Sequence, residues 1–445
     1  MMDKERIREA LQTAIDYSTA DQLEVLASSS TRALTRFSNN YVHQNVSETN
    51  MSISIRAVID KKIGYASTNR LDRDSIKATV DKAIEIAGHR PPDPDFKSLP
   101  SPKPIVERDE VAQTTVSFTP EDRVNAIRKL VNVISPRNLT AAGAFSTGYT
   151  TLGVANTLGV NAVGTLSEAE LKTVVMSETS SAFGSAVAIN VEDIDIEKIA
   201  LEAEEKAVQG QNPVDLKPGV YTVILEPNAV ADMISFMAFA GFGALSMEEG
   251  RSFMKDKIGA QIIHPSISIW DDALDPHQIG LSFDFEGMPK QKVTFIENGI
   301  AKGVCYDSYT ANKEGKESTG HALPAPNVYG PLPLNLIVAE GDSSLEQMIE
   351  TSERAILVSR FHYTNLEDPL RTVLTGMTRD GTFLVEDGEI KSAVKNLRFT
   401  QSILEALKKV ELVSKNRQLK EAILGASYVP WLKISEFNFT GATQF

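Results

Sequence analysis

Residues 220–244, VYTVILEPNAVADMISFMAFAGFGA, contain the pattern that decides the fold of the second half of the chain. The first seven residues are rich in β-branched side chains and predict a strand. A Pro-Asn pair then leads into a helix over residues 229–244, where every residue except Asp232 and Ser235 is apolar or glycine. A helix that is apolar all round is normally buried. The stretch therefore predicts a strand and a core helix that carries no metal ligand and no useful proton donor.

Apart from this helix, residues 213–445 are predicted to form mainly strands. We expect these strands at residues 266–270, 280–286, 292–297, 301–307, 334–339, 355–363, 372–378, 382–386 and 389–394. Three dipeptides are strong signals for tight turns: Asn298-Gly299, Asp380-Gly381 and Asp387-Gly388. Short helices are expected at residues 343–352 and 401–410, the second capped by Thr400. The pattern indicates a large mixed or antiparallel sheet, or a barrel-like one.

Residues 1–212 predict a different, α+β domain. A helix at residues 4–17 is followed by an antiparallel meander over residues 23–67, with turns at 38–40 and 60–62, and by a helix that Gly88 ends. The same order then recurs: a helix after Thr119-Pro120, strands over residues 141–189, and a helix at 194–208. We interpret this as two helix–β-meander–helix halves, residues 1–90 and 119–210, which form an internal repeat. The alternative is two unrelated pieces with a common pattern.

Composition excludes several function classes. The chain has 445 residues, enough for two or three domains, and a formal net charge of −14. No Lys/Arg run is longer than a pair, which argues against a nucleic-acid partner. No apolar run approaches the roughly 20 residues that span a membrane. A single cysteine, Cys305, excludes an internal disulfide, and the charged N-terminal helix does not resemble a signal peptide. We expect a cytoplasmic protein.

No sequence motif indicates a metal site. The six histidines form no HExxH, HExxxH or HxH pattern, and Cys305 has no CxxC partner. We therefore expect no cofactor in this chain. Cys305 itself lies in a predicted strand, where a buried and inert thiol is favoured over a nucleophile because no histidine or helix N-terminus is close in sequence.

Four polar residues are candidates for substrate binding. His321 lies in a long loop rich in Gly and Pro, residues 312–333, and could line a substrate groove together with Asn335. His362 and Asn365 lie at the end of a predicted strand, where β-rich proteins often gather binding groups. Each pair has a plainer alternative: a solvated loop with an incidental histidine for the first, and turn chemistry for the second. No catalytic residue is assigned.

Five segments in order resemble the TldD/PmbA peptidase family. They are the N-terminal stretch RFSNNYVHQNVSETNMSISIRAVIDKKIGYAST, then VANTLGV, the segment from VILEPNAV to GRSFMKDKIG, IENGIAKGVCYDSYTANKEGKESTGHA, and LTGMTRDGTFLVEDGEIKSAVKNLRFT. Each segment is a moderate match, and their order and spacing make the resemblance strong. It extends over nearly the whole chain.

The resemblance also marks a departure from the metal-bearing TldD members. In those, HExxxH on the helix after the VILEP-like strand binds zinc through its histidines, and its glutamate activates water. The equivalent positions here are Ser235, Phe236 and Ala240, and no His or Glu occurs anywhere in residues 229–247. The late cysteine ligand of TldD members is absent too. By this departure the chain resembles the metal-free PmbA (TldE) type.

The resemblance implies a role in peptide proteolysis. In this family a metal-free subunit pairs with an HExxxH-bearing TldD-type subunit, so we expect zinc only in that partner and a peptide as the substrate. This chain would complete the substrate chamber and supply dimer surface. Two alternatives remain: a homodimeric peptide-binding protein without catalysis, and a peptidase with an unrecognised site that uses His321. The family's older name, modulator of DNA gyrase, gains no support from a chain of charge −14.

Overall fold

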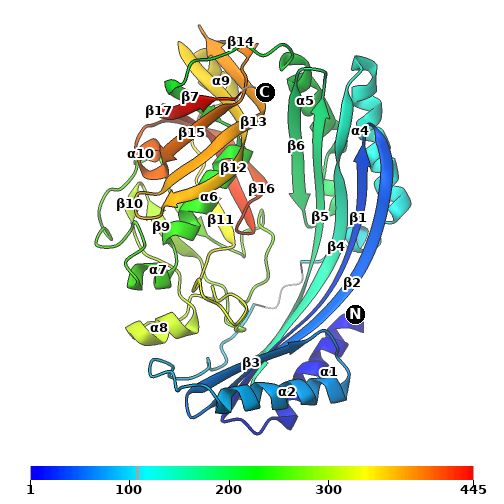
Figure 1. Ribbon diagram of the computed structural model, residues 1–445, viewed down its shortest axis with the longest axis vertical. Helices are drawn as coiled ribbons and strands as arrows, with labels where there is room; N and C mark the ends of the chain where they lie inside the picture. Colours follow the sequence, from blue (N-terminus) through cyan, green and yellow to red (C-terminus); the bar gives the residue numbers. More distant parts are fainter. Residues whose placement is uncertain (1, 107–109, 444–445) are drawn as a thin grey trace.

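The computed structural model describes residues 2–106 and 110–443, which form two parts side by side (Figure 1). The N-terminal part is a long, curved six-stranded sheet with helices along it. The C-terminal part is a more compact, strand-rich body that faces the concave side of the sheet. The predicted α+β class, with a mainly β C-terminal region, is confirmed.

The N-terminal sheet has the strand order β3-β2-β1-β4-β5-β6, and all its pairs are antiparallel. The elements of this part are α1 (Met2–Tyr17), β1 (Gln22–Ser38), β2 (Tyr41–Ile59), β3 (Lys62–Thr68), α2 (Arg73–Gly88), α3 (Gln113–Val116), α4 (Pro120–Ile134), β4 (Thr140–Asn156), β5 (Asn161–Met176), β6 (Ser181–Ala188) and α5 (Ile196–Gln209). The order helix, three strands, helix occurs twice, and β1 and β4 join the two units at the centre of the sheet. The chain crosses to the C-terminal part between α5 and Gly219, so the predicted boundary at 212/213 lies in the connection.

Local sequence signals explain the turns and helix ends of this part. The turn residues Asn39 and Asn40 have positive φ angles of 52° and 64°, which asparagine tolerates and two-residue hairpins require. At α4, Thr119 and Asp122 form a reciprocal capping box, which satisfies two backbone N–H groups at the helix start. The periodicity predicted shorter strands, with breaks at residues 30–31, 47–50 and 150, and these breaks were wrong. β1, β2 and β4 each run unbroken for 17 to 19 residues because their pairing continues on the neighbouring strands.

The helices cover one face of the sheet. Val25 and Ala27 of β1 pack against α1 and α2, while Phe37 on the same face of the same strand packs against α4 and α5. Side chains alternate between faces along a strand. The even-numbered residues of β1 therefore form the other face, which the C-terminal part approaches.

The C-terminal strands close into a ring. β7 (Gly219–Leu225) pairs with both β12 (Arg354–Asp368) and β17 (Ala426–Ala442), and the ring continues through β13 (Val373–Glu386) and β15 (Leu397–Ser402). The remaining strands extend from this ring: β8 (Ile269–Asp271), β9 (Val293–Glu297), β10 (Ile300–Ala301), β11 (Asn335–Val338), β14 (Glu389–Ala393) and β16 (Val410–Glu421). The barrel-like arrangement is thus present, within a mixed sheet.

Five helices accompany the C-terminal sheet: α6 (Pro227–Gly241), α7 (Ala244–Glu248), α8 (Ser308–Glu314), α9 (Leu345–Glu350) and α10 (Ile403–Lys408). The predicted apolar helix, residues 229–244, corresponds to α6, which begins two residues earlier and ends at Gly241, and α7 falls mostly beyond the predicted range. Most of α6 belongs to the largest hydrophobic cluster of the described residues, together with side chains from β7, β12 and β17. Its apolar composition is the reason, because a polar side chain there would need a buried partner.

Four sequence predictions in this part were wrong. Residues 280–286 and most of 301–307 form no strand, and Asp380-Gly381 is an irregularity inside β13 instead of a turn between two strands. The cap of α10 is Ser402, whose hydroxyl accepts a backbone N–H, while Thr400 belongs to β15. In each case partner strands or loops that are distant in sequence decided the local structure.

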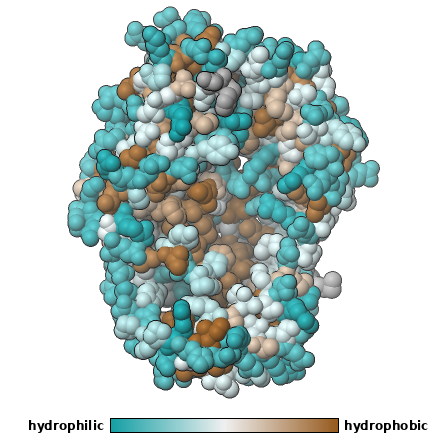
Figure 2. All heavy atoms as spheres, in the orientation of Figure 1, coloured by the Kyte–Doolittle hydropathy of each residue, from teal (hydrophilic) through white to brown (hydrophobic). Residues whose placement is uncertain are grey.

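The two parts meet at two places on the concave face. At one end, Leu152 and Val154 of β4 pack with Phe283, and Arg56 of β2 forms ion pairs with Glu24 and Glu286. At the other end β6 contacts β13 and β16. Figure 2 shows hydrophobic side chains gathered near the middle of the same view, where the surface is hollowed. In the described part of the chain, no helix has the length and apolar character that crossing a membrane requires.

Candidate functional site

The zinc-motif positions of α6 are occupied by core residues. Ser235 is fully buried, and its hydroxyl accepts the backbone N–H of Leu424 at 2.9 Å. Phe236 and Ala240 are 8% and 2% exposed and pack in the core. A zinc ion needs nitrogen, sulfur or carboxylate ligands. These three residues offer none, so a zinc ion does not fit this position.

The rest of the described chain also offers no cluster of side chains suited to a metal ion. Among residues 2–106 and 110–443, no three His, Cys, Asp or Glu side chains come together so that they could hold a metal ion. Cys305 is completely buried, its Sγ donates to the carbonyl of Phe242 at 3.2 Å, and burial raises the pKa of the thiol. It forms an isolated bridge to Gly243 instead of lying in the predicted strand. A protonated, enclosed thiol is a poor nucleophile.

One face of α6 is partly accessible and points away from the core. Asn228, Asp232 and Phe239 recur at helical spacing and are the partly or fully exposed residues within the helix. The Oδ2 atom of Asp232 accepts the hydroxyl of Thr364 at 2.5 Å. Burial raises the pKa of Asp232 to about 6, although Thr364 and a nearby arginine oppose the shift. The raised pKa distinguishes this carboxyl group from an exposed aspartate, and the sequence alone did not indicate it.

An ion pair next to this face connects the two parts of the protein. The carboxylate of Asp380 accepts the Nε of Arg360 at 2.8 Å and the hydroxyl of Ser181 at 2.6 Å. The guanidinium group of Arg360 also lies 4.2 Å from the ring centre of Phe183. Ser181 and Phe183 belong to β6, whereas the ion pair joins β12 and β13. The contact therefore fixes the edge of the N-terminal sheet against the barrel.

A buried lysine reinforces the same junction. Nζ of Lys420, on β16, donates to the backbone carbonyl of Ser185 on β6 at 2.8 Å. Burial, with help from the charge of Lys206, lowers the pKa of Lys420 to about 8, against the attraction of Glu226. Lys206 in turn forms a 2.6 Å ion pair with Glu226, the residue before α6. Polar contacts thus surround the start of α6.

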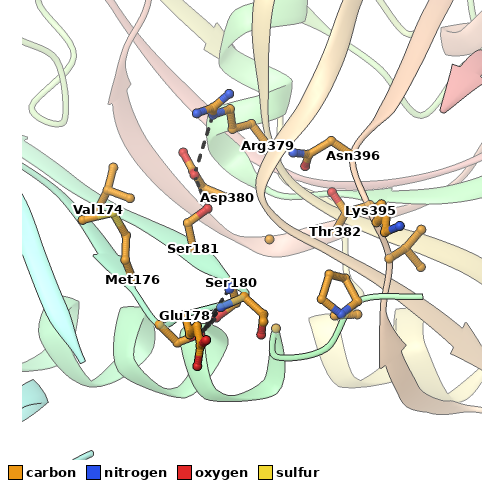
Figure 3. Close-up of a pocket in the computed structure, with 17 residues that line it drawn as sticks. Val174, Met176, Glu178, Ser180, Ser181, Arg379, Asp380, Thr382, Lys395 and Asn396 are labelled. Atoms are coloured by element: carbon orange, nitrogen blue, oxygen red, sulfur yellow. Dashed lines mark hydrogen bonds and ion pairs between the residues drawn. The ribbon is translucent and has the colours of Figure 1, made fainter. Parts of the chain in front are cut away.

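A cavity of about 320 Å³ lies at this junction (Figure 3). In Figure 3 Asp380 points toward Ser181 across it, and Arg379, 40% exposed, lies above. The hydroxyl of Thr382 is buried and has no hydrogen-bond partner among the described residues. The polar lining also includes Ser177, Glu178, Thr179, Ser180, Lys395 and Asn396. Hydroxyl, amide and charged groups of both signs suit a polar ligand. The lining contains no histidine or cysteine that could act as a base or nucleophile.

His321 and Asn335 meet at a third residue, Asp271, inside the C-terminal part. The Nε2 atom of His321 lies 3.0 Å from Oδ1 of Asp271, and the backbone N–H of Asn335 donates to Oδ2 at 2.6 Å. Although burial opposes ionisation, Lys290 and His321 hold the pKa of Asp271 below its usual value, and burial lowers the pKa of His321. The two residues are 1% and 2% exposed. In this conformation neither forms the wall of a groove, and a role in substrate contact stays a prediction.

His362 and Asn365 lie elsewhere, on β12. Burial and the charges of Arg360 and Arg379 lower the pKa of His362, and its ring contacts that of Tyr363. Asn365 is exposed, and its amide donates to the carbonyl of Tyr363. His362 is therefore near the Arg360–Asp380 ion pair. The four predicted residues form two separate pairs, and substrate binding by this second pair also remains a prediction.

The predictions from the sequence did not identify the residues that build the junction, and the reason differs from residue to residue. Arg360 lies two residues before His362 at the end of a predicted strand, and Asp380 lies in a predicted tight turn, so an Arg and an Asp at these positions were the available signal. Asp232 was visible as the single charge in an apolar helix. Ser181 and Lys420 gave no signal, because their role depends on contact between strands that are far apart in sequence.

Comparisons with known proteins agree with this fold. A family model described as PmbA/TldA metallopeptidase C-terminal domain matches residues 218–441, and one described as PmbA/TldA metallopeptidase domain 1 matches residues 23–87. The chain therefore belongs to the TldD/PmbA metallopeptidase family. The resemblance identified from the sequence is confirmed.

Individual relatives divide into two groups. An uncharacterized protein of Methanocaldococcus jannaschii is 28% identical over 307 residues, which are 67% of this chain and 70% of that protein. Metalloprotease PmbA of Escherichia coli O157:H7 is 23% identical over 96% of both chains. A Buchnera aphidicola metalloprotease TldD homolog is 25% identical over 52% of this chain and 48% of its own length. The chain thus aligns with about half the length of that relative.

One solved structure shares the fold along the whole chain. It is TldE from Thermococcus kodakarensis, which has a TM-score of 0.88 and 22% identity, and the match covers 98% of this chain and 100% of that one. The curved sheet and the ring of strands are therefore a known architecture.

Proposed function

We propose that this chain is the metal-free subunit of a TldD/PmbA-type peptidase, which pairs with an HExxxH-bearing subunit and helps to enclose the peptide. The observation that carries the proposal is the composition of α6. Its three motif-equivalent positions hold a hydroxyl that serves the fold, a phenyl ring and a methyl group, all buried. Hydrolysis by the family's zinc chemistry therefore needs ligands from another chain.

The relatives support this assignment over that of a complete TldD-type enzyme. The match to the E. coli protein named PmbA runs through 96% of both chains, whereas the match to a TldD homolog stops at about half.

The concave face of the N-terminal sheet suits the wall of a peptide chamber. Between the two places where the C-terminal part touches it, the accessible side chains are polar and include Ser30, Arg32, Thr150 and Glu168. These groups can hydrogen-bond a peptide backbone without selecting particular side chains. In the C-terminal part, at the end of α6, Phe239 and Tyr329 form an exposed aromatic pair with ring centres 5.7 Å apart.

The experiment combines the purified chain with an HExxxH-bearing TldD-type member of the family. Complex formation is followed by size exclusion with light scattering, zinc by elemental analysis, and cleavage with an unstructured peptide. We expect no cleavage by the chain alone and cleavage by the mixture, with one zinc per heterodimer. The matched control is the same mixture in which the partner carries Gln for the motif Glu, which should bind zinc without cleaving.

Two results would contradict the proposal. Stoichiometric zinc and cleavage by the isolated chain would indicate a site built from ligands distant in sequence. Failure of the mixture to form a complex, together with peptide binding by a homodimer of this chain, would favour the non-catalytic alternative.

A further inference from the structure

Residues 41–52 of β2 form a long exposed strand edge. β3 pairs with β2 only over residues 53–59, and no other strand in the described chain pairs with the outer side of residues 41–52. We call this segment the β2 edge. Twelve residues of extended chain span about 40 Å. Nine of the twelve residues in the β2 edge are exposed, including Tyr41 at 71%.

The direction of the unpaired backbone groups follows from the neighbouring hairpin. Asp60 and Lys61 form a two-residue turn with positive φ angles, so Ile59 and Lys62 are a hydrogen-bonded pair. Alternate residues of β2 therefore turn their N–H and C=O groups toward β3. The same alternation continues in β2 beyond the end of β3. The backbone N–H and C=O groups therefore point outward at Asn45, Ser47, Thr49 and Met51. Even-numbered residues between them pair with β1 instead.

Apart from a register shift against β1 at residues 42–44, the β2 edge lacks the features by which proteins protect exposed edges. Natural sheets block such edges with lysine, proline, bulges or a covering element. The segment YVHQNVSETNMS contains no Lys, Arg or Pro, and Glu48 is its single acidic residue. The other free sides of this sheet are covered: β6 contacts β13 and β16, and the short β3 packs against α2. An unprotected edge of this length indicates a pairing partner.

The geometry points to a second subunit of the same fold as that partner, and specifically to the TldD-type subunit, so this inference rests on the proposed function. We propose that the β2 edge pairs antiparallel with the corresponding edge of that subunit, so that the two curved sheets continue into each other. The family's first domain covers residues 23–87 and so includes the whole edge. A subunit with this domain has a matching curvature, which a pairing over the full length requires.

A peptide substrate is a poorer occupant of this edge. Peptides that add a strand gain specificity from side-chain pockets next to the edge, and the cavities described above do not touch residues 41–52.

The test uses proline at Ser47, where the N–H points outward. Proline removes that donor and places its ring against an incoming strand, yet it breaks no bond to β1. Ser47 is exposed and its side chain has no hydrogen bond in the described structure. For Ser47→Pro we expect the dissociation constant of the complex with the HExxxH-bearing subunit to rise at least about tenfold. The melting temperature of the isolated chain should stay within a few degrees, and Ser47→Ala is the matched control.

A second variant tests the edge without a backbone change. Asn45→Lys combined with Ser47→Lys puts two charges on the edge and should weaken the complex in the same direction. An undiminished complex in both variants would overturn the proposed edge while leaving the partner-subunit function intact. A homodimer of this chain that Ser47→Pro dissociates would overturn the assignment of the partner. Absence of any complex with the wild-type chain would overturn the proposed function itself.

Discussion

Nε2 of His321 lies 3.0 Å from Oδ1 of Asp271, and neither side chain is exposed to solvent. The pair joins the loop after α8 to the end of β8, and the second oxygen of Asp271 receives the backbone N–H of Asn335. A buried carboxylate that loses a partner is costly because its charge cannot be solvated. The geometry therefore favours a structural role for the histidine that the sequence suggested as a groove residue.

Replacing His321 by alanine is expected to lower the free energy of unfolding by about 3 kcal/mol, since Asp271 would remain buried with an unpaired oxygen. Urea unfolding measures this change. The control His277→Ala removes an exposed ion pair with Asp275 and should cost less than about 1 kcal/mol. A His321→Ala chain of unchanged stability that lost an activity of the isolated protein would instead support the alternative of an unrecognised peptidase site.

Asp380→Asn is expected to loosen the contact between the N-terminal sheet and the barrel. The substitution keeps the shape, and asparagine tolerates the positive φ of 52° at this position. It weakens the bonds to Arg360 and Ser181, with a loss of about 2 kcal/mol in unfolding free energy. Limited proteolysis of the connection after α5 provides a second measurement. Arg379→Met, which removes a longer 3.9 Å contact, should change stability by less than about 0.5 kcal/mol. Equal effects of both variants would contradict this assignment.

The raised pKa of Glu24 predicts that the stability of the fold depends on pH. Burial raises the pKa of Glu24 to about 7, and repulsion from Glu286 adds to the shift, although Arg56 opposes it. A carboxyl group whose pKa is raised by folding stabilises the native state below the unfolded pKa, and this contribution is lost as the pH rises through 7. The stability difference between the wild type and Glu24→Gln should therefore fall by up to about 3 kcal/mol from pH 5 to pH 8. Urea unfolding at several pH values measures it, and a difference that grows with pH would contradict the raised pKa.

Restoring the zinc motif in α6 should fail in the isolated chain. The triple variant Ser235→His, Phe236→Glu, Ala240→His puts a carboxylate and two imidazoles at sites that are at most 8% exposed. Burial of the carboxylate and overpacking at Ala240 are expected to destabilise the fold. We expect a lower melting temperature and no stoichiometric zinc by elemental analysis. Ser235→Ala alone, which leaves the N–H of Leu424 without its acceptor, should cost about 1 to 2 kcal/mol. Tight zinc binding by a stable triple variant would show that the site needs only its ligands.

The sequence predicted those elements whose cause is local. The turns at Asn39-Asn40 and Asp387-Gly388, the Thr119 cap and the strand and helix over residues 220–241 all follow from backbone preferences or periodicity within a few residues. The fold class followed from the same periodicity and turn signals, and the family resemblance followed from the order of five segments.

The predictions from the sequence failed where contacts between residues distant in sequence decide the local structure. β16 and β17 were missed, although β17 closes the ring with β7 and β16 pairs with β17. Asp380-Gly381 resembles a hairpin turn, but it forms an irregularity within β13, because β13 pairs with β12 on both sides of it. Strand pairing across long sequence separations outweighs a weak local signal.

The properties of the candidate site divide in the same way, into those that the local sequence sets and those that distant contacts set. The sequence by itself determined that α6 is apolar and lacks the zinc ligands, because composition fixes which chemical groups are present. The tertiary structure decided that His321 is enclosed with Asp271, that Arg360, Asp380 and Ser181 join the two parts, and that residues 41–52 remain an open edge. These properties depend on which strands become neighbours, and that is settled by packing across the whole chain and by no short stretch of it.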